Sequence, residues 1–573
     1  MIRLNKVKAL MSVPGSLYRL LNRKQKISFF VLLMLTVVYS IIETVGISAI
    51  MPFISLASDP GLLATDWYKK AYDITGLDGF EQFIIAFGFL LIFFYFFRAV
   101  YSSLLTYFIA GYSFGIYKYL SKNVLKTILS ISYKLYVQKN SAEQIRVITE
   151  ETNDVGKIVL SVLKMLSEIF PILFIYIVIV ILNWKVTLVI TFVLLLLMLF
   201  LLPSLTKTNK KLGAKRLESG QKIYRLLKES FGNIKFIKIK GNEEEILQTY
   251  DTAASFKART EVLNNVFNTL PKGILESFGF SLLIAAVMFY IRIYHDASAA
   301  IPIISMYALA FYRILPSIHR MMQNIGDIAY LQKTLDNVSG NLHQKHEIEE
   351  SSPLDFNRVI RLENISFKFL TGDDILSGVS FFINKGEKIA ITGESGGGKS
   401  TLIDIITGIH KPVSGKIYID DAVLTDKNIR SWRMKIGYIP QSIYLFDGTV
   451  AENVAFGSAP DNDKIIKALQ RANIWDFLSQ REGLNTLVGE DGIQLSGGQQ
   501  QRIGIARALY DDPEILVLDE ATSSLDNENE KKIMDEIYNI SEKKTLIVIA
   551  HRLSTVERCD RRISIEKGKI TNE

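Results

Sequence analysis

The sequence predicts a membrane α-helical bundle of six transmembrane helices fused to an α/β domain of the P-loop type. The chain has 573 residues and a positive mean hydropathy of +0.21 although 22% of its residues are charged, and this pairing indicates two unlike parts. Residues 353–573 hold 28 Lys and Arg against 33 Asp and Glu, whereas residues 1–352 hold 38 against 25. A glycine-rich loop lies in the second part. We therefore expect a membrane domain over 1–335, a polar linker over 336–352 and a nucleotide-binding domain over 353–573.

Long apolar stretches define the first part. Residues 186–202 form an apolar run without a charge, close to the roughly 20 residues that a helix needs to cross a bilayer. Comparable stretches lie near residues 27–57, 83–110, 160–183, 273–294 and 298–318. Runs of this length disfavour buried helices of a soluble protein. The first stretch is too long for a cleavable signal peptide and carries Glu43.

The charges of the connecting segments predict the orientation. Residues 1–26 hold seven Lys and Arg and no acid, and segments 111–157 and 205–270 hold seven and thirteen basic residues. Segment 58–82 holds two basic residues and five acids. By the positive-inside rule, both termini and the two long segments are cytoplasmic. Positive-inside topology also accounts for the basic charge, so no nucleic-acid partner is expected.

The second part contains a phosphate-binding motif in its expected context. The apolar strand 388–392 leads into a G-x-x-x-x-G-K-S loop, and a helical pattern follows. Glycines let backbone N–H groups surround phosphate oxygens, Lys399 adds positive charge, and the Ser400 hydroxyl can bind Mg²⁺. The expected ATP-binding residues here are Gly393, Glu394, Ser395, Gly396, Gly397, Gly398, Lys399, Ser400 and Thr401.

A second apolar strand, 515–518, ends in two carboxylates. Asp519 is the expected Mg²⁺ ligand beside the phosphate loop, and Glu520 is placed to activate the attacking water as a general base. ATP and Mg²⁺ are therefore the expected cofactors. Cys559 is the only cysteine, which excludes an intrachain disulfide and a cysteine metal cluster.

Residues 495–499 read LSGGQ, a small-residue turn that can cap a helix and hold a phosphate. With this string, residues 353–573 closely resemble the ATP-binding-cassette (ABC) family, of the exporter type. The resemblance implies ATP contacts by Ser496, Gly497, Gly498 and Gln499. It also implies the further roles that follow: Phe369 stacks on adenine, Gln441 senses Mg²⁺ and water, His551 contacts the γ-phosphate, and Asp526 lies at the interface between two cassettes.

One cassette with six spans resembles a half-transporter, an ATP hydrolase coupled to transport. In this family ATP lies between the phosphate loop of one cassette and the LSGGQ of another, so a homodimer is the simplest assembly. The resemblance implies coupling helices near 133–141 and 232–243.

Charged residues within the expected spans indicate the class of substrate. A charge within the membrane is costly, so each one is a candidate functional residue. Arg98, Lys272 and Arg313 predict a site for an anionic group such as phosphate or pyrophosphate, and Glu43 lies among these spans. The alternative is that some of these side chains reach the membrane interface or pair with Glu43.

Stretches such as IETVGISAIMPFISLASD and ALAFYRILPS resemble the PglK family of bacterial lipid-linked oligosaccharide flippases of protein N-glycosylation. This resemblance implies transfer of a polyprenyl-pyrophosphate-linked oligosaccharide, a membrane lipid, from the cytoplasmic to the outer leaflet of the bacterial inner membrane. It also implies an external helix at 64–77, where Trp67, Tyr68 and Tyr72 suit a polyprenyl tail. An ordinary interfacial loop is the alternative there. For the whole chain the alternatives are an ABC exporter of another lipid, drug or peptide, and an ATP-gated channel or regulator.

Overall fold

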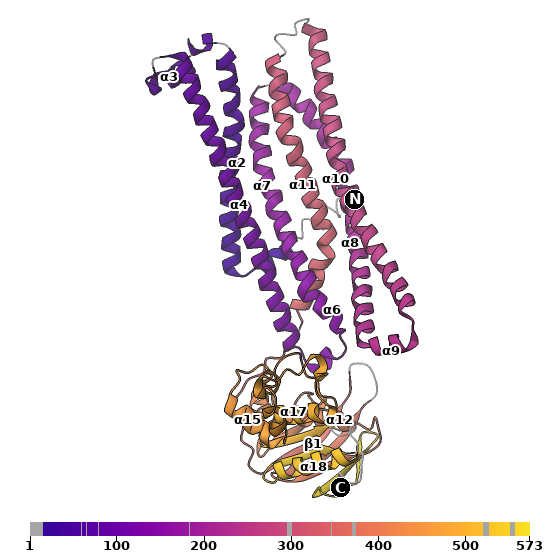
Figure 1. Ribbon diagram of the computed structural model, residues 1–573. Helices are drawn as coiled ribbons and strands as arrows, with labels where there is room; N and C mark the ends of the chain where they lie inside the picture. Colours follow the sequence, from indigo (N-terminus) through magenta and orange to yellow (C-terminus); the bar gives the residue numbers. More distant parts are fainter. Residues whose placement is uncertain are drawn as a thin grey trace. The chain divides into compact units, whose positions relative to one another are not determined.

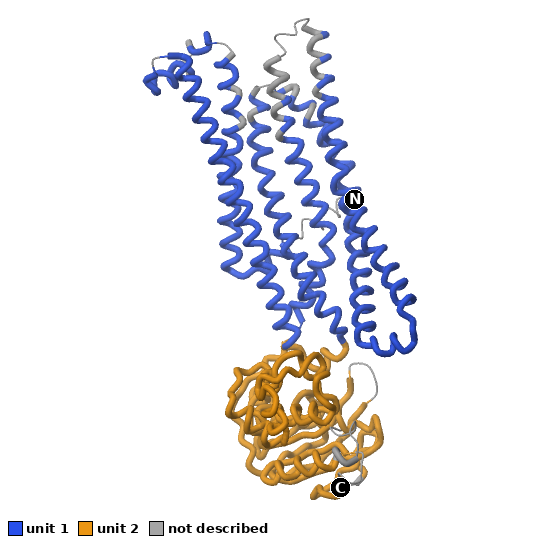
Figure 2. Tube along the Cα trace, viewed as in Figure 1, with its two compact units in different colours: residues 1–129, 139–344 blue, residues 130–138, 345–573 orange. Residues whose placement is uncertain are grey.

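The computed structural model describes residues 15–572, apart from 59, 65, 78, 183, 295–300, 345, 370–373, 520–526 and 551–555. The chain divides into two compact units (Figure 2). The first, the membrane unit, comprises residues 1–129 and 139–344. The second, the cassette unit, comprises residues 130–138 and 345–573, so a short segment from between two long helices belongs to the cassette.

Long helices make up most of the membrane unit (Figure 1). They are α2 (Arg23–Ser58), α4 (Phe80–Ser130), α7 (Thr152–Leu182), α8 (Trp184–Gly232), α10 (Glu243–Tyr294) and α11 (Ile301–Leu342). Short helices are η1 (Pro60–Ala64), α3 (Asp66–Thr75), α6 (Ser141–Arg146), the π-helical η2 (Val147–Glu151) and α9 (Ile234–Lys240). Among the described residues, four segments are long and apolar enough to cross a membrane: Arg23–Ala57, Phe80–Ser130, Ser141–Ile181 and Thr187–Gly232. The expected total of six spans stays a prediction.

The helices are much longer than a bilayer requires. The 51 residues of α4 extend about 75 Å at 1.5 Å per residue, against a hydrocarbon core of about 30 Å. Small residues let α11 approach its neighbours closely. A Cβ on Gly213 would lie 1.8 Å from the Tyr330 carbonyl oxygen, and a Cβ on Gly326 would lie 2.3 Å from Asn268 Oδ1. A side chain at 213 would require the helices to separate, whereas one at 326 would displace the amides of Asn268 and Asn209.

The cassette unit contains two sheets. One has the order β2-β1-β4-β5, and the other has the order β10-β9-β3-β8-β7-β6. The strands are β1 (Val359–Phe367), β2 (Leu376–Asn384), β3 (Lys388–Thr392), β4 (Ser414–Ile419), β5 (Ala422–Val423), β6 (Ile436–Ile439), β7 (Ile515–Asp519), β8 (Thr545–Ile549), β9 (Arg561–Glu566) and β10 (Lys569–Asn572). The helices are α5 (Tyr133–Tyr136), α12 (Lys399–Ile406), α13 (Ile429–Arg433), α14 (Val450–Ala455), α15 (Asn462–Arg471), α16 (Trp475–Ser479), η3 (Gly483–Asn485), η4 (Glu490–Gly492), α17 (Gly497–Leu509) and α18 (Asn527–Ile540).

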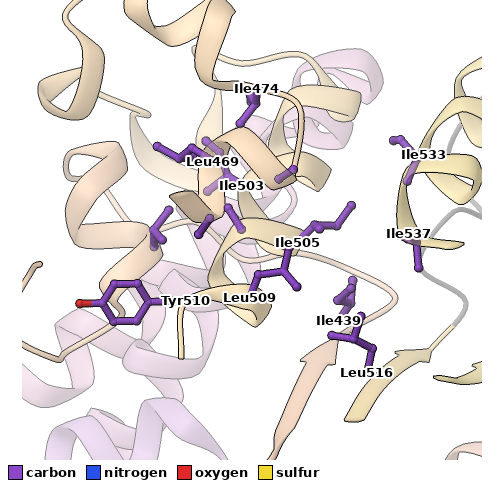
Figure 3. Close-up of a cluster of buried hydrophobic side chains, with 14 of the residues drawn as sticks. Ile439, Leu469, Ile474, Ile503, Ile505, Leu509, Tyr510, Leu516, Ile533 and Ile537 are labelled. Carbon is purple, nitrogen blue, oxygen red and sulfur yellow. The ribbon is translucent and has the colours of Figure 1, made fainter. Parts of the chain in front are cut away.

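Strands β3, β8, β7 and β6 pair in parallel, and β7 and β8 are buried on both faces. In β7, Ile515 and Val517 belong to one hydrophobic core, whereas Leu516 and Leu518 belong to the other. This alternation explains why a continuous apolar run, rather than an alternating one, forms the strand. Figure 3 shows the second core, where β6 and β7 contribute Ile439 and Leu516 and helices α17 and α18 contribute further isoleucines.

The observed helices overlap the expected linker, the expected coupling segments and the expected external helix. Helix α11 continues to Leu342, so the first part of the expected linker at 336–352 is helical, and the unit boundary follows Gln344. Helices α5 and α9 lie within the segments expected to form coupling helices. Helix α3 lies within 64–77, where a short external helix was expected.

Candidate functional site

The register of the parallel sheet brings the expected ATP-site segments to one edge. Ile391 of β3 and Asp519 of β7 both pair with Ile549 of β8, and Ile439 of β6 pairs with Leu518. The residues that follow these strands therefore emerge at the same edge, as ligand-binding residues do in parallel α/β sheets. Three expected site residues, Glu520, Asp526 and His551, lie outside the described residues.

The phosphate loop, Gly393–Lys399, is tightly folded around its lysine. Lys399 Nζ donates to the carbonyl oxygens of Gly393 and Glu394, both at 2.9 Å, and the residue is only 5% exposed. Gly393 has φ +141°, and a Cβ there would lie 2.0 Å from the Ile565 carbonyl oxygen. Gly398, with φ +101°, is the N-cap of α12. The loop thus holds a cation among backbone groups at a helix N-terminus, which suits phosphate.

Three segments at this edge supply oxygen atoms that could bind a cation. Ser400 is in the first turn of α12, Gln441 is exposed just after β6, and Asp519 ends β7. Hydroxyl, amide and carboxylate oxygens are the ligands that suit Mg²⁺. The Tyr438 hydroxyl donates to Asp519 Oδ2 at 2.9 Å. Burial, with the charge of Asp519, raises the pKa of Tyr438, so this phenol remains a neutral donor.

An aromatic cluster supports Phe369, the expected adenine-stacking residue. Phe369 contacts Phe367 edge-on at 5.3 Å and His410 at 5.6 Å between ring centroids. His410 stacks on Phe367 at 4.8 Å, and Tyr133 of α5 packs against its ring at 5.5 Å. Burial lowers the pKa of His410, and the charge of Lys134 adds to this effect. Tyr133, within the segment 130–138, therefore packs against the ring that contacts Phe369.

The LSGGQ segment begins helix α17. Ser496 is its N-cap: the Ser496 hydroxyl accepts from the Gln499 N–H at 3.4 Å, and Gln499 Oε1 accepts from the Ser496 N–H at 2.9 Å. This capping box orders the turn. Ser496 and Gly497 are exposed, so their surface is open to a partner.

In the membrane unit, the structure pairs two of the expected substrate residues with each other. Arg98 Nη2 is 2.6 Å from Glu43 Oε1, an ion pair between α4 and α2. Lys272 is exposed on α10, and Arg313 lies on α11 with its side chain outside the described part. Tyr72 contacts Phe83 edge-on at 5.3 Å, Tyr68 is half-buried, and the side chain of Trp67 is outside the described part. The pairing of Arg98 with Glu43 was the alternative that the sequence left open.

A polar cavity of about 690 Å³ lies among α2, α4, α7, α8, α10 and α11. Its lining includes the cations Lys157, Lys164, Arg216 and Arg320. It also includes the acids Asp154, Glu168, Glu261 and Asp327. Arg98 and Lys272 are not among the described lining residues. The membrane unit thus contains a group of charged residues other than those that the sequence predicted for the substrate site.

Sequence reasoning missed these charges because six of the eight lie outside the apolar stretches; Lys164 and Glu168 lie within the expected span at 160–183. Arg320 donates to Glu168 through Nε at 2.5 Å and Nη2 at 2.9 Å, a bidentate contact between α11 and α7. Arg320 follows Arg313 by seven residues, two helical turns, and this spacing was the available signal. His410 gave no signal, since a lone histidine beside a turn is ordinarily structural.

Comparison with known proteins identifies the family. Residues 27–312 match the ABC transporter transmembrane region, and residues 376–523 match the ABC transporter family. An ATP-dependent lipid A-core flippase of Burkholderia pseudomallei is 42% identical over 215 residues, which cover 37% of this chain and 36% of that protein. This match therefore spans about a third of the relative's length.

Two longer matches cover most of the chain. The heterocyst differentiation ATP-binding protein HepA of Nostoc is 28% identical, covering 79% of this chain and 75% of HepA. A lipid A-core flippase of Paraburkholderia xenovorans is 29% identical, covering 77% and 75%. Among solved structures, a bacterial Atm1-family ABC exporter with ATP bound has a TM-score of 0.77 at 22% identity, covering 96% and 94%. The fold is therefore that of an ABC exporter.

The two matched regions together account for most of the chain, and the second contains the phosphate loop, the LSGGQ helix and strand β7. The protein belongs to the ABC transporter family: it is an exporter-type half-transporter chain, with a multi-pass membrane region fused to an ATP-hydrolysing cassette.

Proposed function

We propose that this chain is an ATP-driven flippase that moves a polyprenyl-pyrophosphate-linked oligosaccharide from the inner to the outer leaflet of the bacterial inner membrane, for protein N-glycosylation. The observation that carries the proposal is the polar, eight-charge cavity within a helical bundle. An apolar drug needs no such lining, whereas a charged, hydroxyl-rich headgroup does. Relatives that are lipid A-core flippases support a glycolipid as substrate, and the resemblance to the PglK family supports the oligosaccharide.

ATP hydrolysis supplies the free energy for this cycle. Lys399 and the loop N–H groups hold the phosphates, and Ser400, Asp519 and Gln441 supply the oxygens that would hold Mg²⁺, which neutralises phosphate charge when bound. Glu520 directly follows Asp519 and acts as the general base for the attacking water. His551 contacts the γ-phosphate. Because these residues follow neighbouring parallel strands, they can act on one nucleotide.

A homodimer completes the site. Ser496 is exposed at the start of α17, as a group that binds ATP held by a second cassette must be. Helix α9 also exposes apolar side chains: Phe236 is 65% and Ile239 75% exposed. These side chains lie beside Lys235, Lys238 and Lys240, in a segment whose basic charge indicates the cytoplasmic side. A cassette of the second copy is the proposed partner of this helix.

The test uses the purified chain in liposomes that contain a lipid-linked oligosaccharide, with ATP-dependent change in the leaflet accessibility of the glycan as the readout. We expect flipping by the wild-type chain and none by Glu520→Gln, which should bind ATP and hardly turn it over. Brisk ATP hydrolysis without flipping would contradict the proposed substrate. Near-normal hydrolysis by Glu520→Gln would contradict the general base.

A second candidate substrate is lipid A, because the lipid A-core flippases are relatives of this chain. Liposomes that contain lipid A form a parallel arm of the same experiment. Flipping of lipid A but not of the oligosaccharide lipid would assign the chain to that substrate.

A further inference from the structure

The carboxylate of Asp404, in the cassette unit, lies without a matching cation. Asp404 is on helix α12, and its side chain is only 23% exposed. Within the part of the chain that the structure describes, no lysine or arginine pairs with it, and its one ion-pair contact is with His410 Nε2, at 3.8 Å. Burial lowers the pKa of His410, so at neutral pH this ring does not compensate the carboxylate. A partly buried acid without a cation is costly, so its presence calls for a physical reason.

Asp404 lies beside the residues that are proposed to hold Mg²⁺. Ser400 and Asp404 are four residues apart on α12, so they share one face of that helix. Burial, together with the negative charge of Asp519, raises the pKa of Asp404 to about 6, so the two carboxylates lie within electrostatic range of each other. Two carboxylates at short range repel each other, and a divalent cation bound next to them offsets that repulsion.

Tyr438 contacts the carboxylate of Asp519 from the neighbouring strand. Tyr438 of β6 pairs with Val517 of β7, and Asp519 is two residues further along β7, so the two side chains lie on the same face of the sheet. The Tyr438 hydroxyl donates to Asp519 Oδ2 at 2.9 Å. Burial and the charges of Asp519 and Asp404 raise the pKa of Tyr438, so the phenol keeps its proton. Groups that hydrogen-bond a metal-binding carboxylate in this way fix its orientation.

We propose that Tyr438 and Asp404 support the Mg²⁺ site of the cassette: Tyr438 fixes the orientation of Asp519, and Asp404 adds negative charge that strengthens the binding of the divalent cation. Both are positioning residues, and neither is proposed to touch the metal. They lie outside the phosphate loop and the LSGGQ segment, and the sequence gave no signal for them. The inference rests on the proposed binding of Mg²⁺ by Ser400, Gln441 and Asp519, and it is independent of the transported lipid.

The proposed roles have different signatures because ATP is itself an anion. Without a metal ion, the charge of Asp404 repels the phosphates, so its removal should tighten nucleotide binding. With Mg²⁺ present, the same charge attracts the cation, so its removal should weaken the contribution of the metal. The Tyr438 hydroxyl is neutral, so its removal should matter only when Asp519 has a metal ion to bind.

The experiment measures the affinity of the full-length chain in lipid nanodiscs for a fluorescent, non-hydrolysable ATP analogue, once in EDTA and once in saturating Mg²⁺. The ratio of the two dissociation constants gives the contribution of the metal. Asp404→Asn should reduce this ratio about tenfold, with tighter binding in EDTA and weaker binding in Mg²⁺. Tyr438→Phe should reduce the ratio by a similar factor and change the affinity in EDTA less than about twofold. With Mn²⁺ as the metal, electron paramagnetic resonance should show more free Mn²⁺ for either variant than for the wild-type chain.

Two neighbouring residues provide matched controls. Tyr510 and Asp511 precede β7, whereas Asp519 ends it, so the controls lie toward the opposite end of that strand. Tyr510→Phe removes a buried hydroxyl that accepts from the Asp461 N–H at 3.1 Å, and Asp511→Asn removes an exposed carboxylate. Both controls should keep the ratio within about twofold of the wild-type value. Equal reductions in the controls and in the test variants would overturn the inference.

The thermal stability of the nucleotide-free, metal-free chain checks for a purely structural role. Asp404→Asn should not lower the melting temperature, because it removes a repulsion. A lower melting temperature would show that Asp404 supports the fold and would overturn its proposed role. For Tyr438→Phe, an equal loss of affinity in EDTA and in Mg²⁺ would show that the hydroxyl supports the nucleotide pocket as a whole, and would overturn its role as well.

The outcomes also separate this inference from the Mg²⁺ site on which it rests. If the wild-type chain bound the analogue equally well in EDTA and in Mg²⁺, the proposed Mg²⁺ site itself would be rejected. If Mg²⁺ strengthened binding by the wild-type chain, and the ratio stayed unchanged in Asp404→Asn and Tyr438→Phe, the Mg²⁺ site would stand and the inference would fall.

Discussion

The Asp327 carboxylate lies where helices α8, α10 and α11 contact one another. Its Oδ1 accepts from Asn268 on α10, Asn268 Oδ1 accepts from Asn209 on α8, and adjacent Gly326 leaves room for both amides. An asparagine at 327 would keep an oxygen for Asn268 and remove the charge. The residue lies beyond the end of the expected span at 318, so pH in the aqueous phase can reach it.

The first prediction concerns the pH dependence of this site. Burial raises the pKa of Asp327 to about 6 in the folded chain, so the folded state holds the proton more tightly than the unfolded state. Stability is therefore lost as the pH rises toward and through 6. Asp327→Asn should stabilise the protein by up to about 3 kcal/mol at pH 8, and by steadily less as the pH falls to 5. Thermal unfolding in detergent measures this, and a gain that does not change with pH would contradict it.

The second prediction concerns His410, whose ring is packed among Phe367, Phe369 and Tyr133. His410→Ala should remove the support of Phe369 and raise the KM for ATP several-fold, about 1 kcal/mol of aromatic contact, with little change in kcat. His410→Phe retains a ring and should restore most of the affinity. Steady-state ATP hydrolysis tests both variants. A fall in kcat at constant KM would instead indicate a role in coupling or in chemistry.

At the scale of the element, the sequence predicted the strand and the loop whose structure depends on residues that are neighbours in the chain. The strand 515–518 was expected from its apolar run, and β7 forms there because both faces are buried. The phosphate loop was expected from its glycines, and Gly393 has the φ and close approach that exclude a side chain. The π-helical turn η2 carries no comparable pattern, because it depends on the burial of Arg146 and Glu151 among other helices. No sequence pattern predicted the ion pairs of the cavity either, because they join helices that are far apart in the sequence.

The third prediction concerns that π-helical turn. Arg146 Nη2 is 2.6 Å from Glu151 Oε1, and both side chains are about 1% exposed. The two residues are five apart, a spacing that a π-helical turn brings together. Arg146→Met or Glu151→Gln should each destabilise the chain by about 3 kcal/mol, since each leaves a buried group unpaired. The double variant should lose less than the sum of the two. Additive losses in thermal unfolding would show that the pair does not couple.

At the scale of the whole molecule, one chain carries the two motifs that the proposed homodimer would combine into each ATP site. The phosphate loop is formed around Lys399, and the LSGGQ helix is capped by Ser496 and exposed. The sequence predicted each half, because each is a local motif. Only the family resemblance predicted the second chain as the partner, since no residue pattern within one chain specifies what covers Ser496. The proposed homodimer therefore needs a test that detects contact in trans.

The fourth prediction provides that test. Chains with Lys399→Ala and chains with Ser496→Arg should each be inactive as homodimers, because both ATP sites of each dimer are damaged. In a heterodimer of the two chains, one site combines both changes, and the other combines an intact phosphate loop with an intact LSGGQ. Heterodimers purified through two different tags should therefore hydrolyse ATP at up to about half the wild-type rate. If each ATP site lay within a single chain, every site in the heterodimer would carry one change and activity would stay absent. The outcome separates a shared site from two independent ones without any assumption about the transported lipid.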